Sequence, residues 1–246
     1  MNSQNEFASL KNKTVLLLGA SSGIGFATAK LAVEEGAQVI IVSSNRERLN
    51  CALEQLPESA KGLVADLSKE EDIKALFEQI EKIDHLVYTA GEPLLVTPIT
   101  GLNLDDARSS FNTRFWGAVA SIRYGAEHIN PGGSILLTSG AAGIKPPKDL
   151  TVVASLCGAI EALVRATAVE LAPLRVNCVT PGFVKTNLWN NIPQKERENM
   201  YSQVGQSLPV KRVGEPQDIA LTFTYLMKQG YITGQSIVVD GGYVLA

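Results

Sequence analysis

The feature that most constrains the fold of this chain is a regular alternation of short apolar runs with longer segments of helical periodicity. Seven runs have the length and composition of buried strands, and they cover residues 14–18, 38–42, 62–65, 85–88, 134–138, 175–179 and 236–239. Each intervening segment is long enough for the helical crossover that joins two parallel strands. The alternation therefore predicts the α/β class, with a doubly wound, seven-stranded parallel sheet flanked by helices.

The segments between these runs predict the helices and the domain organisation. Helical periodicity predicts a helix that opens at Ile24 and others over about 46–55, 69–82, 105–129, 151–172 and 216–229. A chain of 246 residues suits one α/β domain, so a single domain over residues 1–246 is expected. The stretch 187–213 is polar and weakly periodic, and we expect a mobile substrate lid there.

The composition of the chain limits which binding partners and which cellular compartment are expected. The chain is 45% hydrophobic and 19% charged, with a formal net charge of −3, as in soluble globular proteins. No cluster of lysine and arginine stands out, so neither nucleic acid nor a membrane surface is an expected partner. The N-terminal apolar run is too short for a signal or membrane helix, and a cytoplasmic location is expected. The three cysteines and two histidines lack metal-ligand spacing, so no metal site is predicted.

A glycine-rich turn after the first apolar run predicts a dinucleotide site. The segment LLLGASSGIGFATAKLA places Gly19, Gly23 and Gly25 between a strand and a helix. The first glycine permits a tight turn, the second lets backbone amides approach a pyrophosphate, and the third lets the helix pack on the strand. The positive end of the helix then attracts the anion. These residues predict a Rossmann-type cofactor half.

The end of the second strand predicts which dinucleotide is bound. An acidic residue there would accept hydrogen bonds from a ribose 2′-hydroxyl, whereas hydroxyl or basic residues accommodate a 2′-phosphate. The chain has Ser43, Ser44, Asn45 and Arg46 at this point, with no carboxylate before Glu47. This favours NADPH/NADP+ over NAD(H), although Arg46 would also suit a solvated first turn of the next helix.

Several ordered motifs together resemble the classical short-chain dehydrogenase/reductase family. They are GASSGIG from Gly19, ADL at 65–67, TAG at 89–91 with threonine replacing the usual asparagine, RVNCVTPGFVKT from Arg175, and ITGQSIVVDGG near the C-terminus. The resemblance implies cofactor contacts from Gly19, Ser21, Ser22, Gly23, Ile24, Gly25, Ser43, Ser44, Asn45, Arg46, Asp66, Leu67, Ala90, Gly91, Pro181, Gly182, Val184 and Thr186. Family members usually pair through their fourth and fifth helices, so a homotetramer or homodimer is expected.

The same resemblance exposes the absence of the family's usual catalytic residues. A typical member uses a tyrosine as acid, a lysine four residues later, a serine and an asparagine. Ungapped comparison puts Val153 at the tyrosine position and Cys157 at the lysine position. Gly140 takes the serine position, beside Ser139, and Arg114 takes the asparagine position. A carbonyl reductase of the ordinary kind would lack its proton donor, which contributes typically ~10²–10⁴-fold in rate.

Two charged residues remain as predicted catalytic groups. Asp149 lies four residues before the tyrosine position, and we expect it to pair with Arg114 across the floor of the pocket. A fixed carboxylate beside a hydride donor suits an acceptor that is already cationic, such as an iminium. An atypical branch of the family lacks the Tyr/Lys pair and includes fungal alkaloid-pathway reductases that also guide a cycloaddition; its arginine and aspartate are similar in position. Asp149 would equally suit a turn or a helix N-cap.

Three functions therefore stay open at this point. The first is an NADPH-dependent oxidoreductase that reduces an imine or iminium in a bulky, alkaloid-like secondary metabolite, with a templated cyclisation of the Diels-Alder type. The second is a ketone reductase with an unorthodox acid, such as the substrate, water or Cys157. The third is a non-catalytic sensor or scaffold that binds NADP(H). A bulky small-molecule substrate is predicted from the apolar residues expected around the site, namely Leu94, Leu95, Trp116, Trp189 and Tyr201, although Trp116 also suits a subunit contact.

Overall fold

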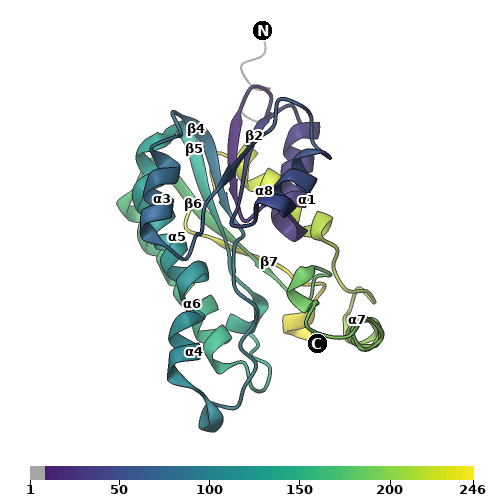
Figure 1. The fold of residues 1–246 in the computed structure, drawn as a ribbon. Helices are drawn as coiled ribbons and strands as arrows, with labels where there is room; N and C mark the ends of the chain where they lie inside the picture. The colour runs from purple at the N-terminus through teal and green to yellow at the C-terminus, as the bar shows by residue number, and fades with distance from the viewer. Residues whose placement is uncertain (1–8) are drawn as a thin grey trace.

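A single twisted parallel sheet organises the molecule. The structure is a computed structural model, and it describes residues 9–246. Its seven parallel strands lie in the order β3-β2-β1-β4-β5-β6-β7 (Figure 1). Their bounds are β1 Thr14–Leu18, β2 Gln38–Ser43, β3 Lys61–Val64, β4 Ile83–Tyr88, β5 Ile129–Thr138, β6 Arg175–Pro181 and β7 Ser236–Val239. The predicted doubly wound α/β fold is confirmed.

Helices cover both faces of this sheet. They are α1 Gly23–Glu34, α2 Arg46–Leu53, α3 Glu70–Phe77, α4 Leu104–Ser109, α5 Ala118–Gly125, α6 Thr151–Glu170, α7 Gln194–Ser207 and α8 Pro216–Lys228. Figure 1 shows α3, α5 and α6 on one face and α1 with α8 on the other. Alternate residues of β1 supply both cores, since Leu16 and Leu18 pack toward α3 and α5 while Val15 and Leu17 pack toward α1 and α8.

One helix, α6, is long and apolar enough by length and composition to cross a membrane, and no other helix in the described part of the chain is. Its buried residues include Leu156, Ile160 and Val164, which belong to the same core cluster as Val176 and Cys178 of β6. The apolar character of α6 is thus used in packing against the sheet.

Two segments differ from the sequence prediction. The helix expected over 105–129 is divided, because Asn112–Gly117 forms a π-helical turn between α4 and α5. No helix was predicted within the stretch 187–213, but it contains the fourteen-residue helix α7; the mobile substrate lid expected there stays a prediction. Gly205 is the one buried residue of α7, and the apolar residues Met200, Tyr201 and Val204 form only a short, partly buried stripe, which is a weak periodic signal. Figure 1 shows α7 beside the carboxyl end of the sheet, near the C-terminus.

The order of the strands places a crevice over β1 and β4. These two strands are neighbours, with Leu16 opposite Leu86, yet the chain leaves β1 toward one face and β4 toward the other. In open α/β sheets, ligands bind at such a switch point, outside the carboxyl ends of the strands. The fold therefore predicts a site between the turn after β1 and the loop after β4.

A buried histidine in β4 predicts how the stability of the fold depends on pH. Burial lowers the pKa of His85 to about 4, whereas an unfolded histidine titrates near 6.5. The unfolded chain therefore binds more protons between these values, and stability falls as the pH drops from about 6.5 to about 4. We expect a loss of roughly 3 kcal/mol over this window. A His85→Gln variant should lose this contribution in urea unfolding; a variant whose stability falls as much as that of the wild type over this window would contradict the assignment.

Candidate active site

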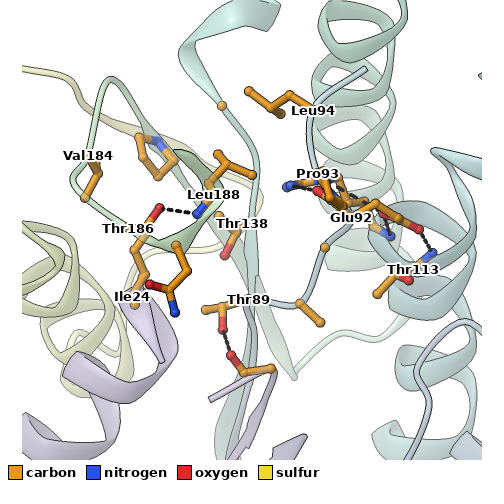
Figure 2. Close-up of a pocket in the computed structure, with 18 of the residues that line it drawn as sticks. Ile24, Thr89, Glu92, Pro93, Leu94, Thr113, Thr138, Val184, Thr186 and Leu188 are labelled. Carbon is orange, nitrogen blue, oxygen red and sulfur yellow. Dashed lines mark hydrogen bonds and ion pairs between the residues drawn. The ribbon is translucent and has the colours of Figure 1, made fainter. Parts of the chain in front are cut away.

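A cavity of about 560 Å³ opens at the predicted switch point. It is bounded by the loops that follow β1, β4, β5 and β6, and Figure 2 shows Ile24, Thr186 and Val184 on one side with Glu92 and Thr113 on the other. The cavity thus lies along the carboxyl edge of the sheet, where the dinucleotide site was predicted. Sixteen of the predicted cofactor residues line it, namely Gly19, Ser21, Ser22, Gly23, Ile24, Gly25, Ser43, Ser44, Asp66, Leu67, Ala90, Gly91, Pro181, Gly182, Val184 and Thr186.

The glycines of the turn after β1 are required by close backbone approach. Gly19 has a φ of 86°, and a Cβ there would lie 2.6 Å from the Ala90 backbone. A Cβ on Gly25 would lie 2.4 Å from the Thr89 hydroxyl. That hydroxyl donates to the Leu18 and Gly19 carbonyls at 3.2 Å, so the threonine at the usual asparagine position ties β4 to β1 (Figure 2).

The N-terminus of α1 is free to hold an anion. Ser22 is the N-cap residue, but its side chain accepts no hydrogen bond from the helix, and no acidic residue lies in the first turn. Within residues 9–246, the first backbone amides of α1 therefore have no side-chain partners, and they carry the positive end of the helix dipole. Thr186 lies beside this turn, 3.5 Å from where a Cβ on Gly23 would lie. This arrangement fits the pyrophosphate of a dinucleotide.

The ribose end of the cavity differs in detail from the prediction. Ser43 and Ser44 line it as expected, and the Ser43 hydroxyl lies 3.0 Å from that of Ser21. Asn45 and Arg46 are not among the lining residues, because the Asn45 side chain instead caps α2 by accepting from the Arg48 amide at 2.8 Å. Arg48 lines the cavity and is the basic residue at this end.

The adenine end is shaped by the turn after β3. The Asp66 backbone amide donates to the Asp72 carboxylate at 3.0 Å, which fixes the turn. Hydrogen bonds from the Ser68 hydroxyl and amide lower the pKa of the Asp66 carboxyl. The carboxylate is therefore held in its charged, accepting form at the mouth of the cavity, beside Leu67.

The positions that normally carry the proton donor lie in the cavity wall without one. Val153 and Cys157 both line the cavity on α6, and so does Gly140. Burial raises the pKa of the Cys157 thiol, which is 5% exposed, so it is a poor acid. The Ser139 hydroxyl is held below it, 3.2 Å from both the Cys157 carbonyl and the Glu161 carboxylate. No side chain at these positions offers a proton of suitable pKa.

The predicted pairing of Arg114 with Asp149 is wrong, because Arg114 pairs with Glu92. Its Nε lies 3.9 Å from the Glu92 carboxylate, its backbone amide donates to that carboxylate at 3.2 Å, and its Nη2 donates to the Glu92 carbonyl. The other carboxylate oxygen accepts from the Thr113 amide (Figure 2). Burial lowers the pKa of the Arg114 guanidinium, and the charge of Glu92 opposes that shift.

Asp149 is instead a turn residue of the loop before α6. Its φ is 66°, a left-handed conformation that aspartate tolerates better than most residues. Its carbonyl accepts from the Thr97 amide at 2.8 Å, which joins this loop to the loop after β4. Asp149 is not among the cavity-lining residues, forms no ion pair within residues 9–246, and is not the N-cap of α6, which is Leu150. Its predicted catalytic role has no geometric support.

An aromatic wall, formed by Phe183, Trp189 and Tyr243, closes the cavity opposite the loop after β4. The Phe183 and Trp189 rings stack with centroids 5.6 Å apart, and Tyr243 meets Phe183 edge-on at 5.5 Å. The Trp189 indole is oriented by donating to the Val184 carbonyl at 2.9 Å. The wall is well suited to a flat, apolar molecule.

Several of the predicted pocket residues are placed differently. Leu94 and Leu95 line the cavity with Trp189, as predicted. Tyr201 and Trp116 do not, and Trp116 is 60% exposed on the far side of the π-helical turn. Phe183 and Tyr243 were missed because no local signal indicates which residue after a Pro-Gly or Gly-Gly pair points inward. The aromatic character of the pocket was therefore predicted correctly from partly different residues.

Comparisons with known proteins agree over almost the whole chain. Residues 19–244 match the family model described as enoyl-(acyl carrier protein) reductase. The chain is 30% identical over 256 residues to the short-chain dehydrogenase/reductase ucsE of Acremonium sp, covering 96% of this chain and 97% of that protein.

Two solved structures are similar in both fold and sequence. The MalC reductase/Diels-Alderase of Malbranchea aurantiaca superposes with a TM-score of 0.90 at 29% identity, covering 98% of this chain and 99% of that one. A small-chain dehydrogenase solved in complex with NADPH superposes with a TM-score of 0.84 at 33% identity, covering 96% of this chain and 100% of that one. Fold, cofactor cradle and chain length thus coincide with one family of reductases.

Proposed function

This chain belongs to the short-chain dehydrogenase/reductase family, and we propose that it is an NADPH-dependent reductase acting on the carbon–nitrogen double bond of a bulky aromatic secondary metabolite. The observation that carries the proposal is the cavity wall on α6, where Val153 and Cys157 stand in place of the proton donor and its lysine. Hydride transfer remains possible there, but Val153 has no proton to give and the buried Cys157 thiol is a poor acid for a product alkoxide.

The residues of the cavity fit NADPH as the cofactor. Gly19, Gly25 and the open N-terminus of α1 leave room and amides for a pyrophosphate. Ser44 and Arg48 present a hydroxyl and a positive charge at the ribose end, where no carboxylate lies between β2 and Glu47. When bound, NADPH supplies a hydride from its nicotinamide ring. Pro181, Val184 and Thr186 lie where they would orient that ring.

Replacing Arg48 by alanine should weaken NADPH binding about tenfold, the value of one charge-assisted contact with a 2′-phosphate. NADH binding should not change, because NADH lacks this phosphate. Arg46→Ala is the matched control, since Arg46 lies on the same helix but outside the cavity. Titration of protein fluorescence with each cofactor measures both constants. A larger effect from Arg46→Ala would contradict the assignment.

The charge balance of the site favours an imine or iminium acceptor. An iminium carbon that receives a hydride passes its π-electron pair to nitrogen and becomes a neutral amine, so the step requires no acid. A ketone becomes an alkoxide, which must gain a proton. Glu92 balances the charge of Arg114, so the pair does not repel a cation as an unpaired guanidinium would. The free N–H groups of Arg114 can hydrogen-bond an oxygen elsewhere on the substrate.

The aromatic wall supports a polycyclic substrate, and the MalC neighbour supports a secondary-metabolite pathway and a templated cyclisation in the same cavity. Stacking against Phe183 and Trp189 would hold a flat ring system and restrict how a flexible tether folds beside it. Such restriction favours a Diels-Alder type ring closure, because that reaction is concerted and can be accelerated by orientation without an acid or a base.

A spectrophotometric screen for NADPH oxidation tests the proposal. The expected result is turnover of bicyclic iminium salts, such as N-methyl-3,4-dihydroisoquinolinium, with little turnover of ketones of the same shape, such as 1-tetralone. Preferential turnover of the ketone would instead support a ketone reductase in which Arg114 hydrogen-bonds the developing alkoxide, a reading favoured by the free donors of its guanidinium. Tight NADPH binding without turnover of either class would support a non-catalytic NADP(H)-binding sensor or scaffold.

The oligomeric state and the cellular location of the protein are proposed from features outside the cavity. Ile99, Leu104 and Trp116 expose apolar surface beside the N-terminal turns of α6, in a shallow groove that also includes Val152. Such a surface suits a contact between subunits, and we expect a cytoplasmic homodimer or homotetramer that pairs through it. Light scattering of the purified protein would distinguish these assemblies from a monomer.

A further inference from the structure

We propose that Glu92 is a positioning residue, which holds the Arg114 guanidinium against the substrate cavity. This inference rests on the proposed function, because that function assigns the reduction to this cavity. The role of Glu92 is the same whether the acceptor is an iminium or a ketone. Glu92 follows directly after Gly91 in the loop that leaves β4, whereas Arg114 lies in the π-helical turn between α4 and α5. The two residues come together only in the folded protein.

The contacts of Glu92 fix both the backbone and the side chain of Arg114. The carboxylate accepts from two successive amides, those of Thr113 and Arg114, and faces the Arg114 Nε at 3.9 Å. The Glu92 carbonyl accepts from the Arg114 Nη2. One residue therefore holds the guanidinium through two separate groups, and only the carboxylate is removable by substitution.

The π-helical turn explains why these amides are available. In this turn the Trp116 amide bonds to the Phe111 carbonyl at 2.9 Å, five residues back, which widens the helix. The Thr113 and Arg114 amides donate to the Glu92 carboxylate, so the carboxylate completes the backbone hydrogen bonding of the turn. Without that carboxylate, the turn that carries Arg114 would lose both backbone hydrogen bonds to Glu92 and keep only the bond from Arg114 Nη2 to the Glu92 carbonyl.

The guanidinium has space beside the cavity because residue 91 is a glycine. A Cβ on Gly91 would lie 2.5 Å from the Arg114 Cζ, so the guanidinium packs flat against this backbone. Both side chains of the pair are largely buried, with 23% of Arg114 and 20% of Glu92 exposed. The Glu92 carboxylate, the Glu92 carbonyl and the Gly91 backbone together hold this largely buried guanidinium. It therefore keeps a fixed direction, which is what orientation of a substrate requires.

Glu92→Gln is the test variant, because glutamine keeps the shape and can still accept from one amide. We expect kcat for the iminium to fall about tenfold, with the Kd for NADPH unchanged. Arg114→Ala should lower kcat about 100-fold, and the Glu92→Gln/Arg114→Ala double variant should equal Arg114→Ala alone, since Glu92 acts through the arginine. Asp105→Asn is the control, because it breaks the exposed Asp105–Arg108 ion pair on α4 without touching the cavity.

Effects that multiply in the double variant would overturn the proposal, as would an unchanged kcat in Glu92→Gln. If Glu92→Gln does not fold, Glu92→Asp replaces it; aspartate keeps the charge but is too short to reach both amides, and a kcat between those of wild type and Arg114→Ala is expected. A kcat for Glu92→Asp equal to wild type would count against the proposal.

A second measurement does not depend on turnover. In the NADP+ complex, the backbone amide protons of Thr113 and Arg114, which donate to the Glu92 carboxylate, should give slowly exchanging NMR signals. Glu92→Gln should remove the protection of at least one of these amides from exchange, because glutamine accepts from one amide only, and an unaltered signal from both would overturn the proposal. A wild-type protein that reduces neither acceptor class would defeat the proposed function, while these signals would still decide the role of Glu92.

Discussion

Replacement of Gly19 by alanine is expected to abolish detectable NADPH binding and to lower the free energy of unfolding by roughly 2 to 5 kcal/mol. Two separate effects add at this position. The residue has a φ of 86°, which an L-side chain rarely adopts, and the new Cβ would lie 2.6 Å from the Ala90 backbone. Because the obstructing atoms are backbone, relief would require the turn after β1 to move away from the loop after β4, and the pyrophosphate cradle would open.

Gly132→Ala separates the two effects. Gly132 has a nearly equal φ of 83°, but a Cβ there meets nothing within 4 Å. This variant should lose only the conformational part, about 1 to 2 kcal/mol, and should bind NADPH as the wild type does. Urea unfolding and calorimetric titration of both variants give the comparison. Equal losses in the two variants would show that the approach of Gly19 to Ala90 does not matter for the cradle.

Gly91→Ala is expected to lower kcat on the order of 100-fold while the protein stays folded. The new Cβ would lie 2.5 Å from the Arg114 Cζ, and the obstructing group is the end of a flexible side chain. The guanidinium should therefore swing away from its place beside Glu92, and the backbone should remain. Steady-state kinetics with the iminium, together with circular dichroism, measure the two parts of this expectation.

The Arg114→Ala background provides the control for Gly91→Ala. Once the guanidinium is removed, the space beside residue 91 is free, so adding Gly91→Ala should cause no further loss of kcat. Gly91 also lines the cofactor part of the cavity, so NADPH titrations accompany the kinetics. A further loss of kcat in the double variant at saturating NADPH would show that Gly91 acts on the reaction without Arg114.

The strands and the cofactor turn were predictable because they depend on local pattern. The run of Leu16 to Leu18 is apolar on both faces, as a strand buried between two layers of helices must be, and the glycines that follow it occur at fixed spacings. The helix α7 was not predictable in this way, because its apolar residues, Met200, Tyr201 and Val204, are too few to give a clear periodic signal.

The basic residue at the ribose end of the cavity, Arg48, could not be identified from the local sequence. Arg46 lies nearer to the end of β2 in sequence, and for that reason the prediction named it. Residues two apart on a helix point about 200° away from each other, however, so Arg46 and Arg48 lie on opposite sides of α2. Once Asn45 caps this helix, its rotation directs Arg48 to the cavity and Arg46 to solvent.

The sequence by itself determined the fold, the dinucleotide cradle and the loss of the usual proton donor at Val153 and Cys157, because these depend on periodicity and on fixed spacings within one segment. Only the tertiary structure decided that Arg114 pairs with Glu92 and that Asp149 serves as a turn residue. Those outcomes depend on the directions of side chains from separate loops that meet at one edge of the sheet. Residue spacing along the chain carries no information about such directions, so the partner of the arginine could be identified only in the folded molecule.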